Sequence, residues 1–384
     1  MDSILDTKRG PSSEIALAIV VNMSMGVLYV WGLFLLPLER DLSIGRAGLS
    51  IVPGVALVCF TIGMVIHAAL LRRLGVRKLT AVAFALAAAG HLVFAFWQGY
   101  AALLFGYGVM FGLGAGLGYG AALAIAACVP DNFRSVAVGL VMASFVASGL
   151  ILPLVFGNAI AQATSGASFG IIGLVLLLIG TLVVIFLPND STGQKAVAEI
   201  PAISWASRSF LRLALIFFLI CFVGLLVVSQ LTGIIVAKGL PRRIADFGPV
   251  LFTLGYLGGS LLGGRVVERL LGRKSLVLSG LIAMAGVLSL FGSSAALILA
   301  GAALIGLVFG GSASLMPILI GELFGVALIG QVYGRLMIAY GAAGLVAPWL
   351  SGFLFAETDS YFISLMLAFV ASAATGLLGS QFKA

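Results

Sequence analysis

Long apolar runs separated by short polar breaks are the main pattern of this sequence. A run of about 18 or more apolar residues is long enough to cross a bilayer as a helix. Twelve such runs lie near residues 14–36, 49–71, 79–97, 101–128, 135–160, 168–187, 209–237, 246–264, 275–293, 295–320, 326–355 and 361–380. The pattern predicts an all-α membrane protein with six transmembrane helices in residues 1–187, a polar linker at 188–208 and six more helices in residues 209–384.

The two predicted halves repeat one another. The segment RRLGVRKLTAV around Lys78 recurs as ERLLGRKSLVL around Lys274, 196 residues later. The segment with Gly149 recurs with Gly344, at an offset of 195, and FGLGAG recurs as FGGSAS from Phe309, at an offset of 198. Three segments at nearly one offset indicate a tandem duplication of a six-helix unit, which is one known way to build a transporter around a central site.

Composition and charge support a lipid environment. The chain has 62% hydrophobic and 9% charged residues, whereas soluble domains carry roughly 25% charged residues. The net charge of +8 does not indicate nucleic-acid binding, because the basic residues stand in short clusters between apolar runs. Sixteen of the 21 lysines and arginines fall on one side if the N-terminus is inside. This bias predicts an inner (plasma) membrane protein, expected to be a monomer, with the linker and both termini in the cytoplasm.

The residues that usually carry chemistry do not cluster. Cys59, Cys128 and Cys221 are scattered through apolar runs and are interpreted as small hydrophobes. His67 and His91 have no ligand partners at metal-binding spacing, so no metal site or cofactor is expected. His91 is interpreted as structural, and His67 as structural or as a gate group. No nucleophile or acid–base pair converges, so an enzyme is not expected.

A glycine-rich stretch, GYGVMFGLGAGLGYG at 106–120, forms a G-x-G-x-x-A match from Gly116 to Ala121 when it is continued by one residue. A dinucleotide site needs a strand before such a motif and a water-exposed helix N-terminus after it. This stretch instead lies inside the fourth apolar run. Glycines at every fourth position clear one helix face for close approach of another backbone; here these are Gly108, Gly112, Gly116 and Gly120. They predict helix packing.

The twelve runs, the central linker and the basic turn after the second and eighth runs together resemble the major facilitator superfamily. Its turn reads roughly Gly-x-x-x-Asp-Arg-x-Gly-Arg-Lys, and GRVVERLLGRK keeps that pattern with one extra residue. The first copy has Arg72 where the acid belongs. The resemblance implies gating roles for Arg72, Arg77, Arg134, Gly264, Glu268, Arg273 and Arg335. For Arg335, snorkelling to lipid headgroups is an equal alternative.

A narrower resemblance is to the monocarboxylate and oxalate–formate exchanger branch. It rests on GVLYVWGLFLLPL in the first run, on GAGLGYGAAL followed by VPDNFRSVAVGL, and on the pair Tyr333-Gly334. Two positions depart from it. Ser260 stands where the branch has a basic residue, eight positions before Glu268, and Tyr340 stands where the oxalate exchangers have a lysine.

The polar groups left inside the runs are the candidate substrate ligands. No charged residue is placed at mid-span, which favours neutral or weakly polar solutes, or a monoanion held by hydroxyls and helix ends. The candidates are Asn22, Tyr29, Tyr119, Ser144, Gln230, Tyr256, Ser260, Phe309 and Tyr340. The alternative for each serine is a bond to its own helix, and Gln230 must bond either to the cavity or to a neighbouring helix.

The sequence thus predicts a secondary transporter that moves a small organic solute by alternating access, its two halves rocking about a central cavity. The family resemblance favours a monocarboxylate-like metabolite. One alternative is an exporter of neutral or amphipathic metabolites or drugs, and another is a non-transporting membrane sensor or assembly factor. The expected partners are the solute and membrane lipids.

Overall fold

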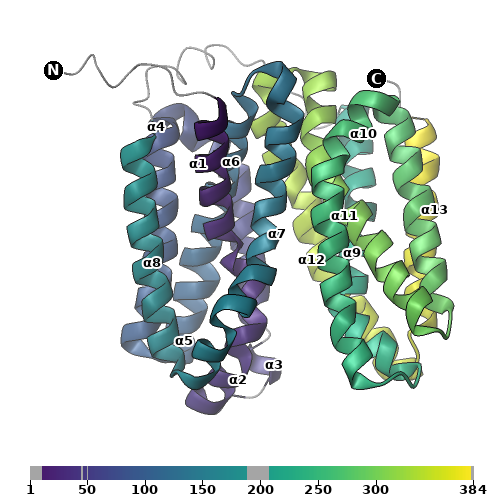
Figure 1. Cartoon of the computed structure of the whole chain (residues 1–384), viewed down its shortest axis with the longest axis horizontal. Coiled ribbons are helices and arrows are strands. Elements are labelled where there is room, and N and C mark those ends of the chain that lie inside the picture. Colours follow the sequence, from purple (N-terminus) through teal and green to yellow (C-terminus); the bar gives the residue numbers. More distant parts are fainter. Residues whose placement is uncertain (1–10, 45, 50, 188–206, 382–384) are drawn as a thin grey trace. The chain divides into compact units, whose positions relative to one another are not determined.

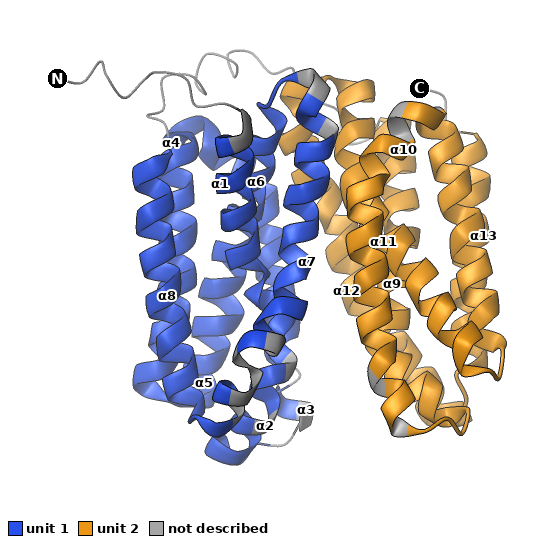
Figure 2. Cartoon of the chain, viewed as in Figure 1, with its two compact units in different colours: residues 1–199 blue, residues 200–384 orange. Residues whose placement is uncertain are grey.

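The computed structural model describes residues 11–44, 46–49, 51–187 and 207–381, and within these ranges the chain is helical with no strand. The chain divides into two compact units, Met1–Glu199 and Ile200–Ala384 (Figure 2). We refer to them as unit 1 and unit 2. Most of the predicted linker, residues 188–206, lies outside the described residues.

Unit 1 contains the first six predicted spans (Figure 1). Its elements are α1 (Pro11–Met25), η1 (Gly26–Val30), α2 (Trp31–Leu42), α3 (Arg46–Leu49), α4 (Ile51–Trp97), α5 (Tyr100–Leu103), η2 (Leu104–Phe111), α6 (Gly112–Ala127), α7 (Asp131–Gln162) and α8 (Ser165–Phe186). The first span is α1, the 3-10 turn η1 and α2 in succession, and the fourth is α5, the π-helix η2 and α6. Helix α4 carries spans two and three and bends at Gly75, whose φ of 76° favours glycine.

Unit 2 contains the other six predicted spans. Its elements are α9 (Arg208–Ala237), α10 (Arg242–Phe291), α11 (Ala295–Phe324), η3 (Val326–Leu328), α12 (Ile329–Thr358) and α13 (Phe362–Ser380). Helix α10 corresponds to α4 and carries two candidate spans, Arg243–Val266 and Gly272–Phe291. Serine side chains cap the N-termini of α9 and α11: the hydroxyls of Ser207 and Ser294 each accept a bond from a backbone N–H three residues on.

The helices account for all twelve predicted spans. Among the described residues, ten are long and apolar enough to cross a membrane, and one of them is the 47-residue α4, which holds two predicted spans. The remaining span, the fifth, is α7, whose apolar part Val136–Leu152 is shorter. Large apolar side chains such as Leu174 and Leu178 of α8 are 59% and 61% exposed, as expected where the solvent is lipid.

Equivalent helices pair in the same way in the two units. In unit 1, α4 packs against α6 and α8, and α1 packs against α6 and α7. In unit 2, α10 packs against α11 and α13, and α9 packs against α11 and α12. A tandem duplication predicts this recurrence of neighbours.

The glycine face predicted for the fourth span is confirmed. Its four glycines, Gly108, Gly112, Gly116 and Gly120, all face the first half of α4. A Cβ on Gly112 would lie 2.5 Å from the carbonyl oxygen of Ala56, and one on Gly116 would collide with that of Phe60. These glycines lie in helical η2 and α6 with no preceding strand, so the dinucleotide interpretation is excluded.

Unit 2 repeats this packing in reciprocal form. A Cβ on Gly259 of α10 would collide with the carbonyl oxygen of Leu307 in α11. A Cβ on Gly310 of α11 would collide with the carbonyl oxygen of Tyr256 in α10. Glycines from both helices therefore bring the two backbones into contact, which fixes the position of Tyr256 against α11.

Candidate functional site

Four aromatic rings from four spans meet in unit 1, and we call them the unit 1 aromatic group. They are Tyr29 of η1, Phe60 of α4, Tyr119 of α6 and Phe145 of α7. The Phe145 ring centroid lies 5.0 Å from that of Tyr119, 5.5 Å from Tyr29 and 5.7 Å from Phe60. The contacts of Phe145 with both tyrosines are edge to face, the favoured geometry for aromatic pairs.

The four rings differ in exposure. Phe60, Tyr119 and Phe145 are buried, whereas Tyr29 is 37% exposed. Gly26, one turn before Tyr29, has no room for a side chain, because a Cβ there would collide with the carbonyl oxygen of Phe145. The close approach of η1 to α7 thus presents Tyr29 as the open member of the group.

Two predicted ligands, Asn22 and Ser144, converge on one backbone atom. Asn22 donates from Nδ2 to the carbonyl oxygen of Val141 at 2.5 Å, and the Ser144 hydroxyl donates to the same oxygen at 2.7 Å. Asn22 is fully buried, and its Oδ1 has no hydrogen-bond partner among the described residues. Asn22 therefore joins the first span to the fifth and keeps one acceptor for another donor.

Three predicted residues meet in unit 2, and we call them the unit 2 aromatic group: Tyr256 of α10, Phe309 of α11 and Tyr340 of α12. Phe309 contacts Tyr256 edge to face at 5.4 Å between centroids and lies parallel to Tyr340 at 6.4 Å. All three are buried. Phe309 rests on Gly224 of α9, where a Cβ would lie 2.6 Å from its Cγ, so α9 also sets the position of this ring.

Ser260, one turn beyond Tyr256, is fully buried between α10 and α11. Its hydroxyl donates to the carbonyl oxygen of Gly310 at 2.9 Å, and the Ser314 hydroxyl donates to the carbonyl oxygen of Ser260 at 2.5 Å. At the position where the exchanger branch has a cation, this chain thus has a reciprocal link between two helices.

Gln230 lies away from the unit 2 aromatic group. It is six residues beyond Gly224 on α9, or about 9 Å along the helix, and its Oε1 accepts a bond from the Tyr361 hydroxyl at 3.3 Å. Of the two alternatives for Gln230, the structure shows a bond to a neighbouring element, here the segment between α12 and α13.

The predicted gating residues occupy varied surroundings. Arg134 is half-buried and donates from Nε to the carbonyl oxygen of Ala127 at 3.0 Å, so its charge lies at the C-terminal end of α6. Of the others, Arg72 and Arg273 are exposed, Arg77 and Arg335 are half-buried, Gly264 is buried, and the side chain of Glu268 lies outside the described ones.

Both histidines are buried inside unit 1. Nδ1 of His91 donates to the carbonyl oxygen of Ala87 at 2.8 Å, and its ring is surrounded by aromatic rings, the nearest being Phe111 at 4.7 Å. Nδ1 of His67 donates to the carbonyl oxygen of Met64 at 2.5 Å, and its ring packs on Gly120. Within the described ranges, no three histidine, cysteine or acidic side chains converge as a metal site would require.

An ion pair holds the end of the first span. Nε of Arg40 lies 2.8 Å from Oδ1 of Asp41, and Arg40 also donates from Nη2 to the carbonyl oxygen of Ala163 at 3.0 Å. Oδ2 of Asp41 accepts a bond from the backbone N–H of Ser165 at 2.6 Å. The bond from Arg40 lowers the pKa of Asp41 to about 2. Together these contacts fasten α2 to the start of α8.

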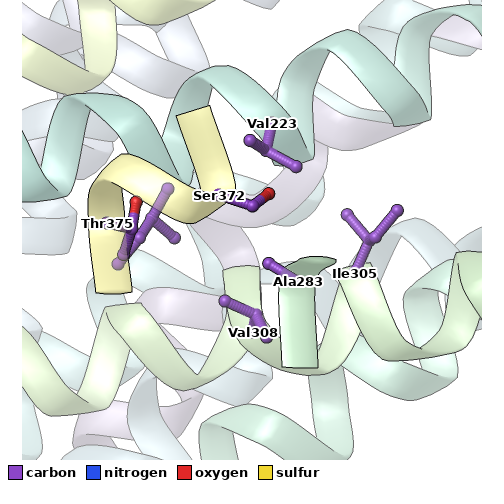
Figure 3. A pocket seen from close by; sticks show the side chains of 7 residues that line it. Val223, Ala283, Ile305, Val308, Ser372 and Thr375 are labelled. Carbon is purple, nitrogen blue, oxygen red and sulfur yellow. The ribbon is translucent and has the colours of Figure 1, made fainter. Parts of the chain in front are cut away.

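A small cavity in unit 2 is not a substrate site. Figure 3 shows its lining side chains, which come from α9, α10, α11 and α13: Ile220, Val223, Ala283, Ile305, Val308, Ser372 and Thr375. Its volume is about 10 Å³, room for about one water molecule. An organic solute does not fit there.

Sequence analysis missed Phe60 and Phe145, which complete the unit 1 aromatic group. The signal was present in the duplication, because Phe60 precedes the predicted Tyr256 by 196 residues and Phe145 precedes Tyr340 by 195. Ser314 was missed as well, since serines in apolar spans usually bond to their own helix.

Comparisons with known proteins agree with this architecture. The model of the Major Facilitator Superfamily matches residues 15–245, and no curated protein matches. Among solved structures, FucP in the outward conformation has a TM-score of 0.73 at 16% identity, covering 97% of this chain and 99% of that one. The proton:xylose symporter XylE, bound to 6-bromo-6-deoxy-D-glucose, has a TM-score of 0.74 at 15% identity, covering 97% and 94%. A variant of the E. coli fucose:proton symporter FucP has 0.72 at 16%, covering 97% and 98%.

At these identities the structural likeness shows the fold alone, and the substrates of those symporters are not transferred. The family match covers more than half of the chain. Together with its apolar helices, this makes the protein an integral membrane protein and a secondary transporter. The chain belongs to the Major Facilitator Superfamily.

Proposed function

We propose that this transporter carries a small, uncharged or weakly polar organic solute by alternating access, and that the aromatic group of each unit supplies ligands for it. The observation that carries the proposal is the chemistry of these groups. They combine ring faces and edges with the hydroxyls of Tyr29, Tyr119, Tyr256 and Tyr340.

The physical argument is the free-energy cost of moving a charged group out of water. A carboxylate removed from water needs a cation or several donors to compensate. The two positions where the exchanger resemblance expects a cation hold Ser260 and Tyr340, both buried. Aromatic faces carry negative electrostatic potential and disfavour an anion above the ring. A neutral solute meets neither of these costs.

The solved relatives fit a neutral class. FucP and XylE are named for fucose and xylose, which are uncharged. A monocarboxylate-like metabolite is the second candidate, and it rests on the first-span signature and the Tyr333-Gly334 pair. An acid of this kind would have to be held by tyrosine hydroxyls and helix ends. An exporter of neutral or amphipathic compounds falls within the first class, and a non-transporting sensor would show binding without flux.

The gating roles belong to the same proposal. Arg72, Arg77, Arg134, Gly264, Glu268, Arg273 and Arg335 would control opening at the cytoplasmic side, with both termini on that side and the protein acting as a monomer. Arg134 supports this best, because it ties the start of α7 to the end of α6 and so couples the helix of Phe145 to that of Tyr119.

A thermal-shift screen of the purified protein tests the substrate class. Neutral sugars and polyols, short monocarboxylates and dicarboxylates would each be added at two pH values. A ligand at a hundred times its Kd stabilises the folded state by roughly 2.7 kcal/mol. Stabilisation by neutral compounds, followed by their uptake into proteoliposomes, supports the proposal. Stabilisation by monocarboxylates alone makes the second candidate the function.

A further inference from the structure

An open groove in unit 2 is lined by apolar side chains and by two basic ones, one of which is the proposed gating residue Arg273. Its volume is about 420 Å³. It is lined by Leu270, Arg273, Lys274, Val277, Leu278 and Leu281 of α10 and by Ser380 of α13. Two adjacent cations thus stand beside a strip of branched apolar side chains. This combination of charge and apolar surface is that of an amphiphile site.

The depth of these residues in the membrane follows from the helix. The candidate span Gly272–Phe291 begins one residue before Arg273, so both cations stand at the level of the lipid headgroups. Leu281 is seven residues after Lys274, or about 10 Å further into the hydrocarbon layer. Its side chain is 57% exposed. The groove therefore runs from the headgroup level into the region of the acyl chains.

The walls of the groove are held in place by close helix packing. A Cβ on Gly280 of α10 would lie 2.5 Å from the backbone nitrogen of Gly376 in α13. A Cβ on Gly379 would lie 2.7 Å from Cβ of Leu276. Because α10 and α13 meet here with so little side chain between them, the groove exists without a ligand, and binding needs little ordering of the protein.

The two cations project to the surface of the described part of the chain. Arg273 and Lys274 are both exposed, and neither forms an ion pair with a described side chain. A zwitterionic lipid would add a positive ammonium to this pair, whereas an anionic lipid adds only negative charge. Basic sites between helices at the cytoplasmic level are typical of anionic headgroup binding.

We propose that this groove binds one anionic phospholipid, with its phosphate on Arg273 and Lys274 and one acyl chain along Val277, Leu278 and Leu281. The bound lipid spans the contact between α10 and α13 and stabilises unit 2. The site does not depend on the substrate class proposed above.

Native mass spectrometry of the detergent-purified protein tests the site. The protein is equilibrated with phosphatidylglycerol or with phosphatidylcholine of the same acyl chains. One phosphatidylglycerol should be retained in preference to phosphatidylcholine. Each basic residue near an anionic headgroup contributes about five-fold in affinity, so Arg273→Gln with Lys274→Gln should weaken retention about 25-fold.

The duplication offers a matched control. Arg77→Gln with Lys78→Gln removes the same charges from the equivalent turn of unit 1 and should leave retention at the groove unchanged. Equal loss in both double variants would show general surface attraction and overturn the proposal. Equal retention of phosphatidylcholine by the unchanged protein would overturn it as well.

A second variant keeps both charges and narrows the groove. Leu281→Trp at this exposed position should weaken phosphatidylglycerol retention at least several-fold while the protein stays monodisperse. Retention unaffected by Leu281→Trp would mean that no acyl chain lies there. Glycerol phosphate, the headgroup without chains, should not displace the lipid; displacement at equal concentration would reduce the site to one for a free phosphate.

Discussion

The two aromatic groups share two equivalent positions of the duplicated units but carry their hydroxyls differently. Phe60 and Phe145 of unit 1 correspond to Tyr256 and Tyr340 of unit 2. Unit 1 has its hydroxyls on Tyr29 and Tyr119 instead, and only Tyr29 has an open side. At these two positions both units have an aromatic ring, and only unit 2 has a hydroxyl on it.

The backbones differ too. The first and fourth spans of unit 1 contain a 3-10 turn and a π-helix, and these meet where the Tyr107 hydroxyl donates to the carbonyl oxygen of Val27 at 3.4 Å. Helices α9 and α11 of unit 2, which correspond to these spans, are each assigned as one helix over their described lengths. Such irregular turns are frequent at functional sites, and in unit 1 they lie inside two spans, whereas the 3-10 helix η3 of unit 2 lies between α11 and α12.

The largest expected effect comes from breaking the backbone contact of unit 2. Gly310→Ala should destabilise the protein by about 1–3 kcal/mol, because the new Cβ collides with the backbone of Tyr256. The melting temperature in detergent measures this. Gly258→Ala is the control: no atom lies within 4 Å of its new Cβ, and alanine favours a helix by up to about 1 kcal/mol. Equal melting temperatures for the two variants would contradict the packing.

A change at the open ring tests the unit 1 group. Tyr29→Ala should lower transport about ten-fold or more with normal membrane expression, because the exposed aromatic face is lost. Tyr29→Phe should retain most binding if the ring, and not its hydroxyl, makes the contact. Uptake into proteoliposomes measures both. Unchanged transport in Tyr29→Ala would remove this residue from the substrate path.

The hydroxyls of unit 2 are tested by Tyr340→Phe. Phenylalanine is the residue that unit 1 has at the equivalent position 145, so the fold should tolerate it. If the hydroxyl bonds the solute, KM should rise about five-fold, corresponding to about 1 kcal/mol for one hydrogen bond. A KM equal to that of the unchanged protein would show that the ring alone acts.

Substitutions of Ser260 and Ser314 distinguish a structural role of these serines from a role in substrate binding. Ser260→Ala and Ser314→Ala should each lower stability by about 1 kcal/mol, because each removes a hydrogen bond between α10 and α11. Thermal unfolding and KM would be measured together in both variants. A change of KM in Ser260→Ala without loss of stability would reverse the assignment and return Ser260 to the substrate ligands.

The smallest expected effect is a pH dependence of the melting temperature that is present for Asp41 of unit 1 and absent for Tyr361 of unit 2. The Asp41 carboxylate, with its pKa lowered to about 2, stabilises unit 1 fully above its ordinary pKa of 3.8, and this contribution is lost as pH falls towards 2. Asp41→Asn should therefore lower the melting temperature slightly at pH 7 and progressively less as the pH falls below about 4. Tyr361→Phe removes an uncharged link in unit 2 and should show no such acid dependence.

Much of the fold could be predicted because lipid imposes long apolar helices. The twelve spans and the face of Gly108, Gly112, Gly116 and Gly120 follow from run length and period. The candidate substrate site was harder to predict from the sequence. A phenylalanine such as Phe145 looks the same in sequence whether it faces lipid or a cluster of rings. Likewise, the partners of Ser260 and Gln230 are 54 and 131 residues away, and such contacts depend on tertiary packing that no local pattern encodes.

The reciprocal glycines between α10 and α11 have a mechanical consequence. Where the two backbones are in direct contact, no side chain between them can change rotamer, so a movement of one helix is passed directly to the other. Tyr256 of α10 and Phe309 of α11 both belong to this pair of contacting helices. A displacement of either ring is therefore expected to move both helices of this pair together.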